Sequence, residues 1–467
     1  MQTIDFEKFL MQTIDFEKFS QYSKPGPRYT SYPTAVEFKE NFNEESLKTA
    51  FFNHDNLKNP MPLSLYTHLP FCRSACYFCA CSVIYTSLEE KKTRYISYLK
   101  KELALLKNAM NTNREVAQFH YGGGTPTFFS PIQLDEITQS IQEVFPNFSQ
   151  DIEMSCEIDP RHFTKEHMQT LFDRGFNRLS FGVQDFDFEV QKAIHRIQPF
   201  EMVQESVKLA RDYGIKSINF DLIYGLPNQT KEGFLKTLEW VLKLDPDRLA
   251  VFNYAHVPWV KKTMRKIDET LLPSPRDKLE ILESLISFLE KANYQMIGMD
   301  HFAKSDNELY LALQKAQLRR NFQGYTTKKF TQTIGIGVTS IGEGSDYYTQ
   351  NYKDLHHYEK ALDLGHLPVE RGVSLTKEDA LRKEVIMQMM SNLKLDYSKI
   401  EEKFPIDFKA HFKKELEKLK PYEEAGLLVF NPKGFEMTKT GGMLVRNMAM
   451  EFDAYLRGGE KHFSKTL

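Results

Sequence analysis

Four of the five cysteines in this 467-residue chain lie between positions 72 and 81. Cys72, Cys76 and Cys79 are separated by three and then two residues, so one short loop can place their thiolates around a single compact inorganic centre. Three thiolates suit a cube of four irons and four sulfides, and they leave one iron without a protein ligand. The spacing therefore predicts a [4Fe–4S] cluster with one iron open to chemistry.

Two other cysteine chemistries fit this pattern less well. A structural zinc site normally closes four ligands, and no second Cys or His pair follows the loop at a suitable distance. Zinc stays a minority interpretation. Disulfides are typical of small, cysteine-dense secreted chains, whereas this chain is long and starts without an apolar secretory segment.

The remaining two cysteines have different expected roles. In an extended Cys-x-Cys segment both side chains point the same way, so Cys81 can lie near the cluster. As a ligand it would fill the open corner, and we interpret it as a nearby non-ligand. Cys156 lies in an apolar-rich run, where an inert buried thiol is expected.

Composition indicates a globular protein. The chain is 41% hydrophobic and 27% charged, with a formal net charge of −2, so its charge gives no basis for nucleic-acid binding. It contains no run of about 18 apolar residues, which argues against a membrane span. Without a signal segment, we expect the reducing cytoplasm as its location.

The N-terminal region has two unusual features. Residues 1–10 and 11–20 are identical at nine of ten positions, and we interpret residues 1–10 as a duplicated start or an artefact. Residues 22–35 are rich in proline and tyrosine, which predicts an extended, non-helical arm. This arm is either a surface strap or a cover for a flat ligand.

Short strand-like runs alternate with helix-like stretches from about residue 62 to 305. Six strands separated by helices predict right-handed crossovers and a parallel sheet. The strand-like runs are 63–68, 116–121, 152–159, 178–183, 217–224 and 249–256, and the helix-like stretches are 88–106, 131–144, 165–174, 201–213 and 231–244. A helix at 274–292 and a strand at 294–299 extend the pattern.

Polar residues recur where these strands end. The cysteine loop follows the first strand and Gly122–Gly124 follows the second, while Glu157, Gln184 and Asp221 lie near the ends of later strands. Such convergence is typical of a barrel mouth and predicts a partial parallel (β/α)6 barrel. The three glycines lack both nucleotide-binding fingerprints, and they instead expose backbone to a small, amino-acid-like ligand.

Residues after about 370 form a separate pattern. Thr376–Asp379 resembles a capping box that begins a helix running through Met390. Residues 426–438 read as a hairpin with its turn at 431–434, and a final helix starts at about Lys439. We expect a small helical, winged-helix-like domain that serves as a substrate lid rather than a DNA reader. The expected domains are 1–61, 62–369 and 370–467.

These motifs together resemble one family. From about Tyr22 onward the chain is similar to the oxygen-independent coproporphyrinogen III oxidases, a family of radical S-adenosylmethionine enzymes. The matching stretches are 26–35, 72–81, 122–127, 157–160, 182–186, 221–227, 251–256, 298–302 and 320–327.

The resemblance implies a set of cofactor contacts. It implies that Cys72, Cys76 and Cys79 hold a [4Fe–4S] cluster, and that Cys81 matches a family cysteine that is not a ligand. The residues expected to contact a first S-adenosylmethionine are Tyr66, Gly123, Glu157 and Ile341. Those expected to contact a second are Phe78, Gly124, Thr125, Gln184, Arg196, Asp221 and Ala255.

The resemblance also implies a reaction. Two propionates of coproporphyrinogen III would become vinyl groups, giving protoporphyrinogen IX, while S-adenosylmethionine is cleaved to methionine and 5′-deoxyadenosine. An electron donor for the cluster and a terminal electron acceptor would be needed, and we expect a monomer. A haem-trafficking relative is the alternative, but that family lacks the fourth cysteine and the arm, and both are present here.

Overall fold

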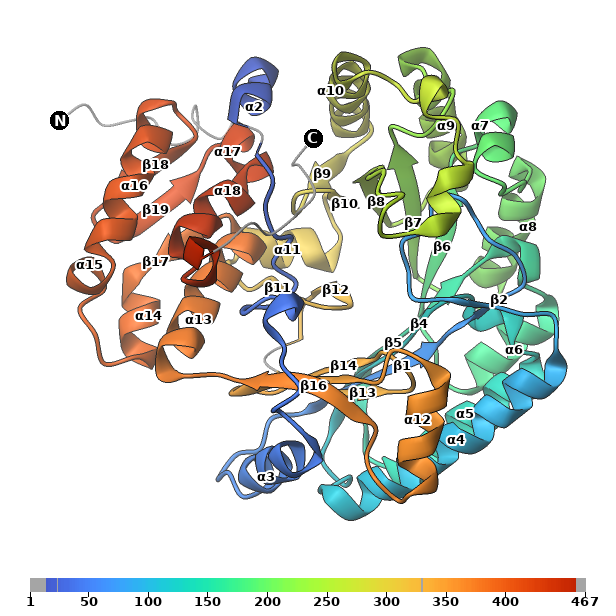
Figure 1. The fold of residues 1–467 in the computed structure, drawn as a ribbon. Coiled ribbons are helices and arrows are strands. Elements are labelled where there is room, and N and C mark those ends of the chain that lie inside the picture. The colour runs from blue at the N-terminus through green and yellow to red at the C-terminus, as the bar shows by residue number, and fades with distance from the viewer. Residues whose placement is uncertain (1–13, 23, 329–330, 459–467) are drawn as a thin grey trace. The chain divides into compact units, whose positions relative to one another are not determined.

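The computed structural model describes residues 14–22, 24–328 and 331–458 (Figure 1). The duplicated residues 1–10 lie outside these ranges. Two compact units are present, and we call them the barrel unit (36–273 and 328–375) and the C-terminal unit (1–35, 274–327 and 376–467). Contacts thus group residues 274–327 with the C-terminal helices, while the three sequence-based domain ranges stay a prediction.

Six parallel strands follow one another in sequence order through the barrel unit. They are β1 (Leu63–Leu69), β4 (Val116–Gly123), β5 (Phe148–Ile158), β6 (Arg178–Gln184), β7 (Ser217–Tyr224) and β8 (Arg248–Asn253). Because neighbours in this series are parallel, their carboxyl ends meet at one edge of the sheet. This order confirms the predicted (β/α)6 arrangement.

Helices connect these strands and lie along their outer side (Figure 1). They are α4 (Glu89–Ala109), α5 (Pro131–Val144), α6 (Lys165–Asp173), α7 (Phe188–Ala193), α8 (Phe200–Asp212) and α9 (Lys231–Leu244). In α5 the Ser130 side chain accepts from the Gln133 amide and the Gln133 side chain accepts from the Ser130 amide, a capping box that sets the start. Leu134, Ile137 and Ile141 then bury one face of the helix.

On the other side of β1 the sheet continues with strands that the sequence did not predict. Strand β13 (Gln332–Ile336) pairs in parallel with β1, and β14 (Ile341–Glu343), β15 (Tyr347–Asn351) and β16 (Val369–Ser374) follow antiparallel. Helices α3 (Glu44–Asp55) and α12 (Leu355–Asp363) complete this part of the barrel unit.

The C-terminal unit is mainly helical. Its helices include α2 (Phe16–Tyr22), α10 (Pro275–Lys291), α11 (Glu308–Gln314), α13 (Lys377–Asn392), α14 (Tyr397–Lys403), α15 (Phe408–His411) and α16 (Lys413–Glu424). Its strand pairs are β9 (Tyr294–Met296) with β10 (His301–Lys304) and β11 (Arg319–Asn321) with β12 (Gly324–Thr326). A further sheet has the order β17 (Lys394–Asp396), β19 (Gly434–Met437), β18 (Leu428–Asn431).

Two C-terminal expectations are confirmed and one is corrected. The Thr376 capping box begins α13, and β18 and β19 form the expected hairpin with Asn431 opposite Gly434. The expected single final helix is instead two short ones, α17 (Lys439–Met443) and α18 (Val445–Ala449). A Cβ on Gly441 would lie 1.7 Å from the Leu427 carbonyl oxygen, so close packing requires glycine where glycine also weakens a helix.

From residue 24 to 34 the arm contains neither helix nor strand, and its Tyr29 and Tyr32 side chains are buried rather than on the surface. The buried Tyr29 hydroxyl donates to Asp453 at 2.8 Å, and the Tyr32 hydroxyl accepts from the Ala454 amide at 3.1 Å. The interpretation of the arm as a surface strap is therefore wrong for both tyrosines. They fasten the arm into the core of the C-terminal unit.

Among the residues that the structure describes, no helix combines the length and the apolar character that a membrane crossing requires.

Candidate active site

A cavity of about 210 Å³ lies in the barrel unit at the carboxyl ends of the parallel strands. Its walls come from the cysteine loop and from residues that lie within or after β4, β5 and β6, together with Asp221 of β7. Sequence-predicted residues on its wall are Cys72, Cys76, Phe78, Cys79, Gly123, Gly124, Thr125, Glu157, Gln184, Arg196 and Asp221. Residues spread over the sequence from Cys72 to Asp221 thus line one cavity.

Three predicted residues are absent from this wall. Tyr66 lies beside it, because its ring stacks on His120 at 5.8 Å and His120 Nε2 lies 3.4 Å from Glu157 Oε1. Ala255 is exposed after β8, and Ile341 pairs with Gln350 in the β14–β15 ladder.

The cysteine loop is fixed at both ends and in its middle. Strands β2 (Phe71–Cys72) and β3 (Ile84–Tyr85) pair Cys72 with Tyr85 across its base. Within the loop, the Tyr77 amide donates to the Ile194 carbonyl at 2.9 Å, and His195 Nδ1 lies 2.8 Å from the Ala75 carbonyl oxygen. Residues just after α7 therefore position the loop before any metal binds.

The three cysteines fit a cluster better than a single metal ion. Among the described residues, no three Cys, His, Asp or Glu side chains come together as ligands of one ion. In a cube each thiolate binds a different iron, so the three sulfurs must surround a volume rather than meet at a point. Cys72, Cys76 and Cys79 surround the cavity in this way.

Two arginines and one aspartate form a charged group beside Cys76. Arg161 and Arg196 donate to Cys76 Sγ at 3.5 and 3.6 Å, and they pair with Asp159 at 2.7 and 3.1 Å. Burial alone would raise the pKa of Asp159, but the two guanidinium groups outweigh it and hold that pKa well below its usual range. The aspartate is therefore charged, and it holds both cations next to a thiolate position.

The cysteine side chains differ in their readiness to ionise. Burial raises the pKa of Cys72 to about 12, although its Sγ also hydrogen bonds with Thr125 Oγ1 at 3.2 Å. A hydrogen bond from Cys81, helped by the charges of Lys261 and Arg196, lowers the pKa of Cys79 to about 6 despite burial. The same hydrogen bond raises the pKa of Cys81. The opposite shifts share one cause, the contact between the two thiols.

The triple glycine brings the backbone close to Glu157. The Gly123 amide donates to Glu157 Oε2 at 3.2 Å, and Gly123 has a φ of 117°, which other residues rarely adopt. A Cβ on Gly124 would lie 2.7 Å from the Pro70 carbonyl oxygen, so this position also requires glycine. The result is a carboxylate and bare backbone together on the cavity wall.

The ends of β6 and β7 complete the site. Gln184 has a φ of 67° beside a bulge in the β6–β7 register, which turns its side chain out of the regular alternation. Asp221 accepts from Ser180 Oγ at 3.1 Å and from Asn219 Nδ2 at 2.9 Å. Both side chains lie on the cavity wall.

Sequence reasoning placed Asp159 at the end of a predicted strand but missed three other residues that shape this site, namely His120, Arg161 and Gln198. His120 contacts Glu157, Asp159 and Arg161 flank Cys76, and the buried Gln198 accepts from Arg196 Nε at 3.1 Å through its Oε1. Asp159 ends the predicted strand 152–159 and Arg161 follows it by two positions, which was a usable signal. The pairing of Asp159 with Arg196 was not predictable, because it depends on a tertiary contact.

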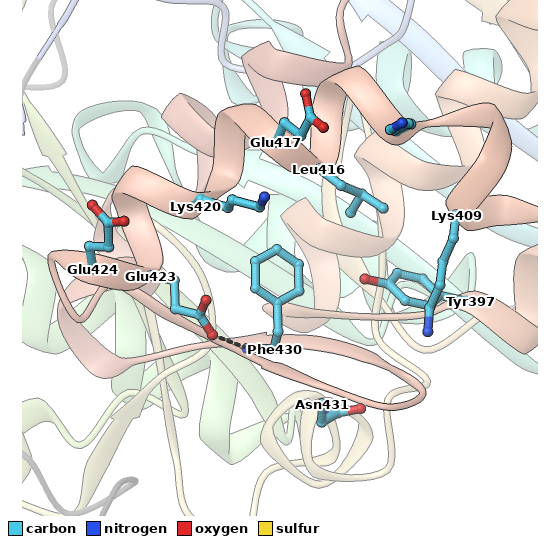
Figure 2. A pocket seen from close by; sticks show the side chains of 10 residues that line it. Tyr397, Lys409, Leu416, Glu417, Lys420, Glu423, Glu424, Phe430 and Asn431 are labelled. Atoms are coloured by element: carbon cyan, nitrogen blue, oxygen red, sulfur yellow. Dashed lines mark hydrogen bonds between the residues drawn. The ribbon is translucent and has the colours of Figure 1, made fainter. Parts of the chain in front are cut away.

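A second cavity, of about 480 Å³, lies in the C-terminal unit against α16 (Figure 2). Figure 2 shows the Phe430 ring between Lys420 and Tyr397, with the Phe430 amide donating to Glu423 Oε1 at 3.1 Å. Three lysines and three glutamates line it, so its charge is balanced. It offers no preference for an anionic ligand.

Family comparisons agree with the site. Residues 66–241 match the model of the radical SAM superfamily, where SAM is S-adenosylmethionine, and residues 375–444 match that of the HemN C-terminal domain.

Relatives and a solved structure agree as well. An oxygen-independent coproporphyrinogen III oxidase of Helicobacter pylori strain J99 is 97% identical over all 467 residues of both chains, the duplicated first ten included. The enzyme of the same name from Escherichia coli strain K12 is 44% identical over 94% of each chain. A solved structure of coproporphyrinogen III oxidase from Escherichia coli, described as a radical SAM enzyme, superposes with a TM-score of 0.90 at 42% identity, covering 95% of this chain and 100% of that one. The chain therefore belongs to the oxygen-independent coproporphyrinogen III oxidases of the radical S-adenosylmethionine superfamily.

Proposed function

We infer that the protein oxidatively decarboxylates two propionates of coproporphyrinogen III to vinyl groups, giving protoporphyrinogen IX in haem biosynthesis. One observation carries the inference: three cysteines and the carboxylates Glu157 and Asp221 surround one cavity in a chain 44% identical to an oxidase of that name. The same family relationship implies a [4Fe–4S] cluster and two molecules of S-adenosylmethionine as cofactors.

We assign the cluster to Cys72, Cys76 and Cys79. When bound, the cluster and S-adenosylmethionine supply the electron and the carbon radical that remove a hydrogen atom from a propionate. We keep Cys81 outside the ligand set, because a fourth thiolate would fill the iron that must stay open for S-adenosylmethionine. Arg161 and Arg196 place positive charge beside Cys76.

The first S-adenosylmethionine is assigned to one side of the cavity. Glu157 supplies a carboxylate for an ammonium or sulfonium group, and the Gly123 backbone allows the amino-acid part to approach closely. Tyr66 and Ile341 are the other two assigned contacts, and Tyr66 reaches this side through its stacking on His120.

The second S-adenosylmethionine is assigned to the opposite side. Arg196 can pair with its carboxylate and Asp221 with its amino group, since both lie on the cavity wall. The other assigned contacts are Phe78, Gly124, Thr125, Gln184 and Ala255.

The remaining partners follow from electron balance. Each propionate gives up a hydrogen atom, one electron and carbon dioxide, so the protein needs an electron donor for the cluster and a terminal acceptor for the released electron. We propose that the protein works in the cytoplasm, where thiols stay reduced, and that it acts as a monomer.

Anaerobic turnover tests the assignment. Reconstituted protein with a reductant, S-adenosylmethionine and an electron acceptor should convert coproporphyrinogen III to a product lighter by two carboxyl groups and two hydrogen atoms. Mass spectrometry identifies that product. Cleavage of S-adenosylmethionine with an unchanged porphyrinogen mass would overturn the substrate assignment and leave only the radical chemistry.

The haem-trafficking alternative is not favoured. The curated relatives carry the oxidase name over nearly the full chain. A haem carrier has no need to cleave S-adenosylmethionine, so formation of 5′-deoxyadenosine coupled to decarboxylation separates the two functions.

A further inference from the structure

The segment that follows β8 packs directly against the cysteine loop. Met264 and Ile267 are buried in a hydrophobic cluster against which Tyr77 and Phe78 of the loop also pack. Lys261 Nζ donates to the Cys81 carbonyl oxygen at 2.8 Å. The backbone of this segment and that of the loop are therefore held together as one surface.

The outer side of the same segment is amphipathic and cationic. We call residues 259–266 the basic segment, because they contain four lysines and arginines and no acidic residue. Trp259 is 70% exposed and Val260 is 64% exposed, and Lys262 is exposed beside them. Lys266 Nζ lies 5.1 Å from the centre of the Tyr77 ring, so positive charge continues onto the cysteine loop.

A run of lysines is usually no more than a solvated surface. Here an exposed tryptophan lies among the cations, and aromatic anchors within a charged rim are typical of protein interfaces. Two acidic residues follow the segment: Asp268 accepts from the Thr270 amide at 3.0 Å, and Glu269 lies 3.0 Å from His256. Four cations against these two carboxylates leave residues 259–269 net positive, and Lys262, Arg265 and Lys266 are exposed.

We propose that the basic segment is the docking surface for an acidic protein that delivers single electrons to the cluster. The proposal rests on the proposed function, which requires such a donor. Electron tunnelling weakens steeply with distance, so a donor must approach next to the cysteine loop, and the basic segment is bonded to that loop. Redox encounters use small interfaces that form quickly, for which one aromatic anchor and complementary charge suffice.

The electron transfer balances with no other reactant. A flavin hydroquinone in the donor loses one electron and becomes a semiquinone, and the oxidised cluster gains that electron. No bond in the basic segment forms or breaks, and its role is to hold the two redox centres near each other.

The test compares two reductants of different size. The probes are a reduced flavodoxin, which is an acidic flavoprotein, and photoreduced deazaflavin, which is small and needs no docking surface. The variant Trp259→Ala/Lys262→Glu changes two exposed side chains of the basic segment. The matched control is Ile132→Ala/Lys236→Glu, which changes an 80% exposed isoleucine on α5 and an exposed lysine on α9.

Cluster reduction is followed spectroscopically in the reconstituted full chain. In the Trp259/Lys262 variant the rate with flavodoxin should fall at least tenfold at low ionic strength, and the loss should shrink as salt is added. Its rate with deazaflavin, and both rates of the control variant, should match the wild type. An unchanged flavodoxin rate, or an equal loss with both reductants, would overturn the proposal.

A different result would assign the surface to the substrate instead. If the variant raised the KM for coproporphyrinogen III with deazaflavin as reductant while the flavodoxin rate stayed unchanged, the cations would bind substrate carboxylates and the docking proposal would fail. The proposed function fails separately, when deazaflavin-reduced wild type forms no vinyl product.

Discussion

At the scale of single residues, the site depends on charges that share partners. Asp159 holds Arg161 and Arg196 together, and both arginines reach Cys76. Removing one arginine therefore leaves Asp159 paired with the other, and the fold tolerates the loss. A ligand that pairs with the removed arginine has no second partner of this kind.

Substitution of the cluster cysteines should separate ligands from neighbours. Wild-type protein should bind about four irons and four sulfides per chain, and Cys72→Ser, Cys76→Ser or Cys79→Ser should abolish the cluster. Cys81→Ser should keep it, because a serine hydroxyl can still donate to Cys79. Iron and sulfide analysis of anaerobically reconstituted protein checks this. A cluster lost in Cys81→Ser would move that cysteine into the ligand set.

Arg196→Ala should weaken one cofactor site without affecting the cluster. A charge-assisted hydrogen bond to a carboxylate contributes about 1.5–3 kcal/mol, so binding of the second S-adenosylmethionine should weaken roughly ten- to a hundredfold. Equilibrium binding and iron content measure the two effects. Arg211→Ala is the control, since Arg211 pairs with Asp247 at 2.9 Å outside the cavity. Equal binding by both variants would refute the contact.

Gln198 should position Arg196 rather than touch a ligand. Its amide group donates to the Gly182 carbonyl at 3.0 Å while its Oε1 accepts from Arg196. Gln198→Leu leaves these buried groups without a partner, which should destabilise the fold by about 1–3 kcal/mol and loosen cofactor binding. Thermal unfolding and binding measure both. Gln139→Leu, at an exposed glutamine bonded to Glu143, should change neither.

At the scale of elements, the sequence predicted the helices and strands that show a regular pattern of apolar residues. Leu134, Ile137 and Ile141 place α5. Strand β4 is buried on both faces, although Gln118 and His120 interrupt its apolar residues. Strand β13 was missed because it begins with Gln332 and Thr333, which look like loop residues. Both are buried, and Gln332 accepts from Arg114 at 2.6 Å and donates to Tyr347 at 2.8 Å.

In the candidate site, too, residues with a local sequence signal were predictable and tertiary contacts were not. Cys72, Cys76 and Cys79 were predictable because their chemistry depends on local spacing, and Glu157 because it closes a predicted strand. The contact between Arg161 and Cys76 joins residues 85 positions apart, and no local pattern encodes it. Its prediction needed the register of β5 against β1 and β4.

A buried carboxyl group on α4 should make the barrel unit sensitive to pH. Glu102 accepts from the Gly337 amide at 2.7 Å, from Asn351 at 2.6 Å and from the Tyr358 hydroxyl at 2.6 Å. Burial raises its pKa from 4.5 to about 7, even though these hydrogen bonds oppose the rise. Between these values the folded chain keeps a proton that the unfolded chain has lost, so unfolding free energy falls as pH rises.

From pH 5 to pH 8 this single group should lower the stability of the wild type by roughly 2–3 kcal/mol relative to Glu102→Gln, which cannot titrate. Unfolding temperatures of the two proteins across this range measure the difference. Glu136→Gln, at an exposed position bonded to Lys100, should show no such trend relative to the wild type. A constant gap between wild type and Glu102→Gln would contradict the assigned pKa.

At the scale of the whole molecule, a net charge of −2 hides an uneven distribution. The cavity against α16 balances its lysines and glutamates, whereas residues 259–266 carry four cations and no carboxylate. Local charge, not net charge, decides which partners a surface attracts. Of these two surfaces, the basic segment is the one that favours an acidic partner, and it is the one that packs against the cysteine loop.

The electron balance of the whole reaction gives the last prediction. Each propionate consumes one S-adenosylmethionine and one donor electron, and it releases one electron when carbon dioxide leaves. With an acceptor present, two 5′-deoxyadenosines and two carbon dioxide molecules should form per protoporphyrinogen IX. Without an acceptor the released electrons have no outlet, so vinyl product should fall while cleavage of S-adenosylmethionine continues. Anaerobic assays that quantify all three products check this ratio. Full product without an acceptor would show that the released electron returns to the cluster and that the protein needs only catalytic amounts of its donor.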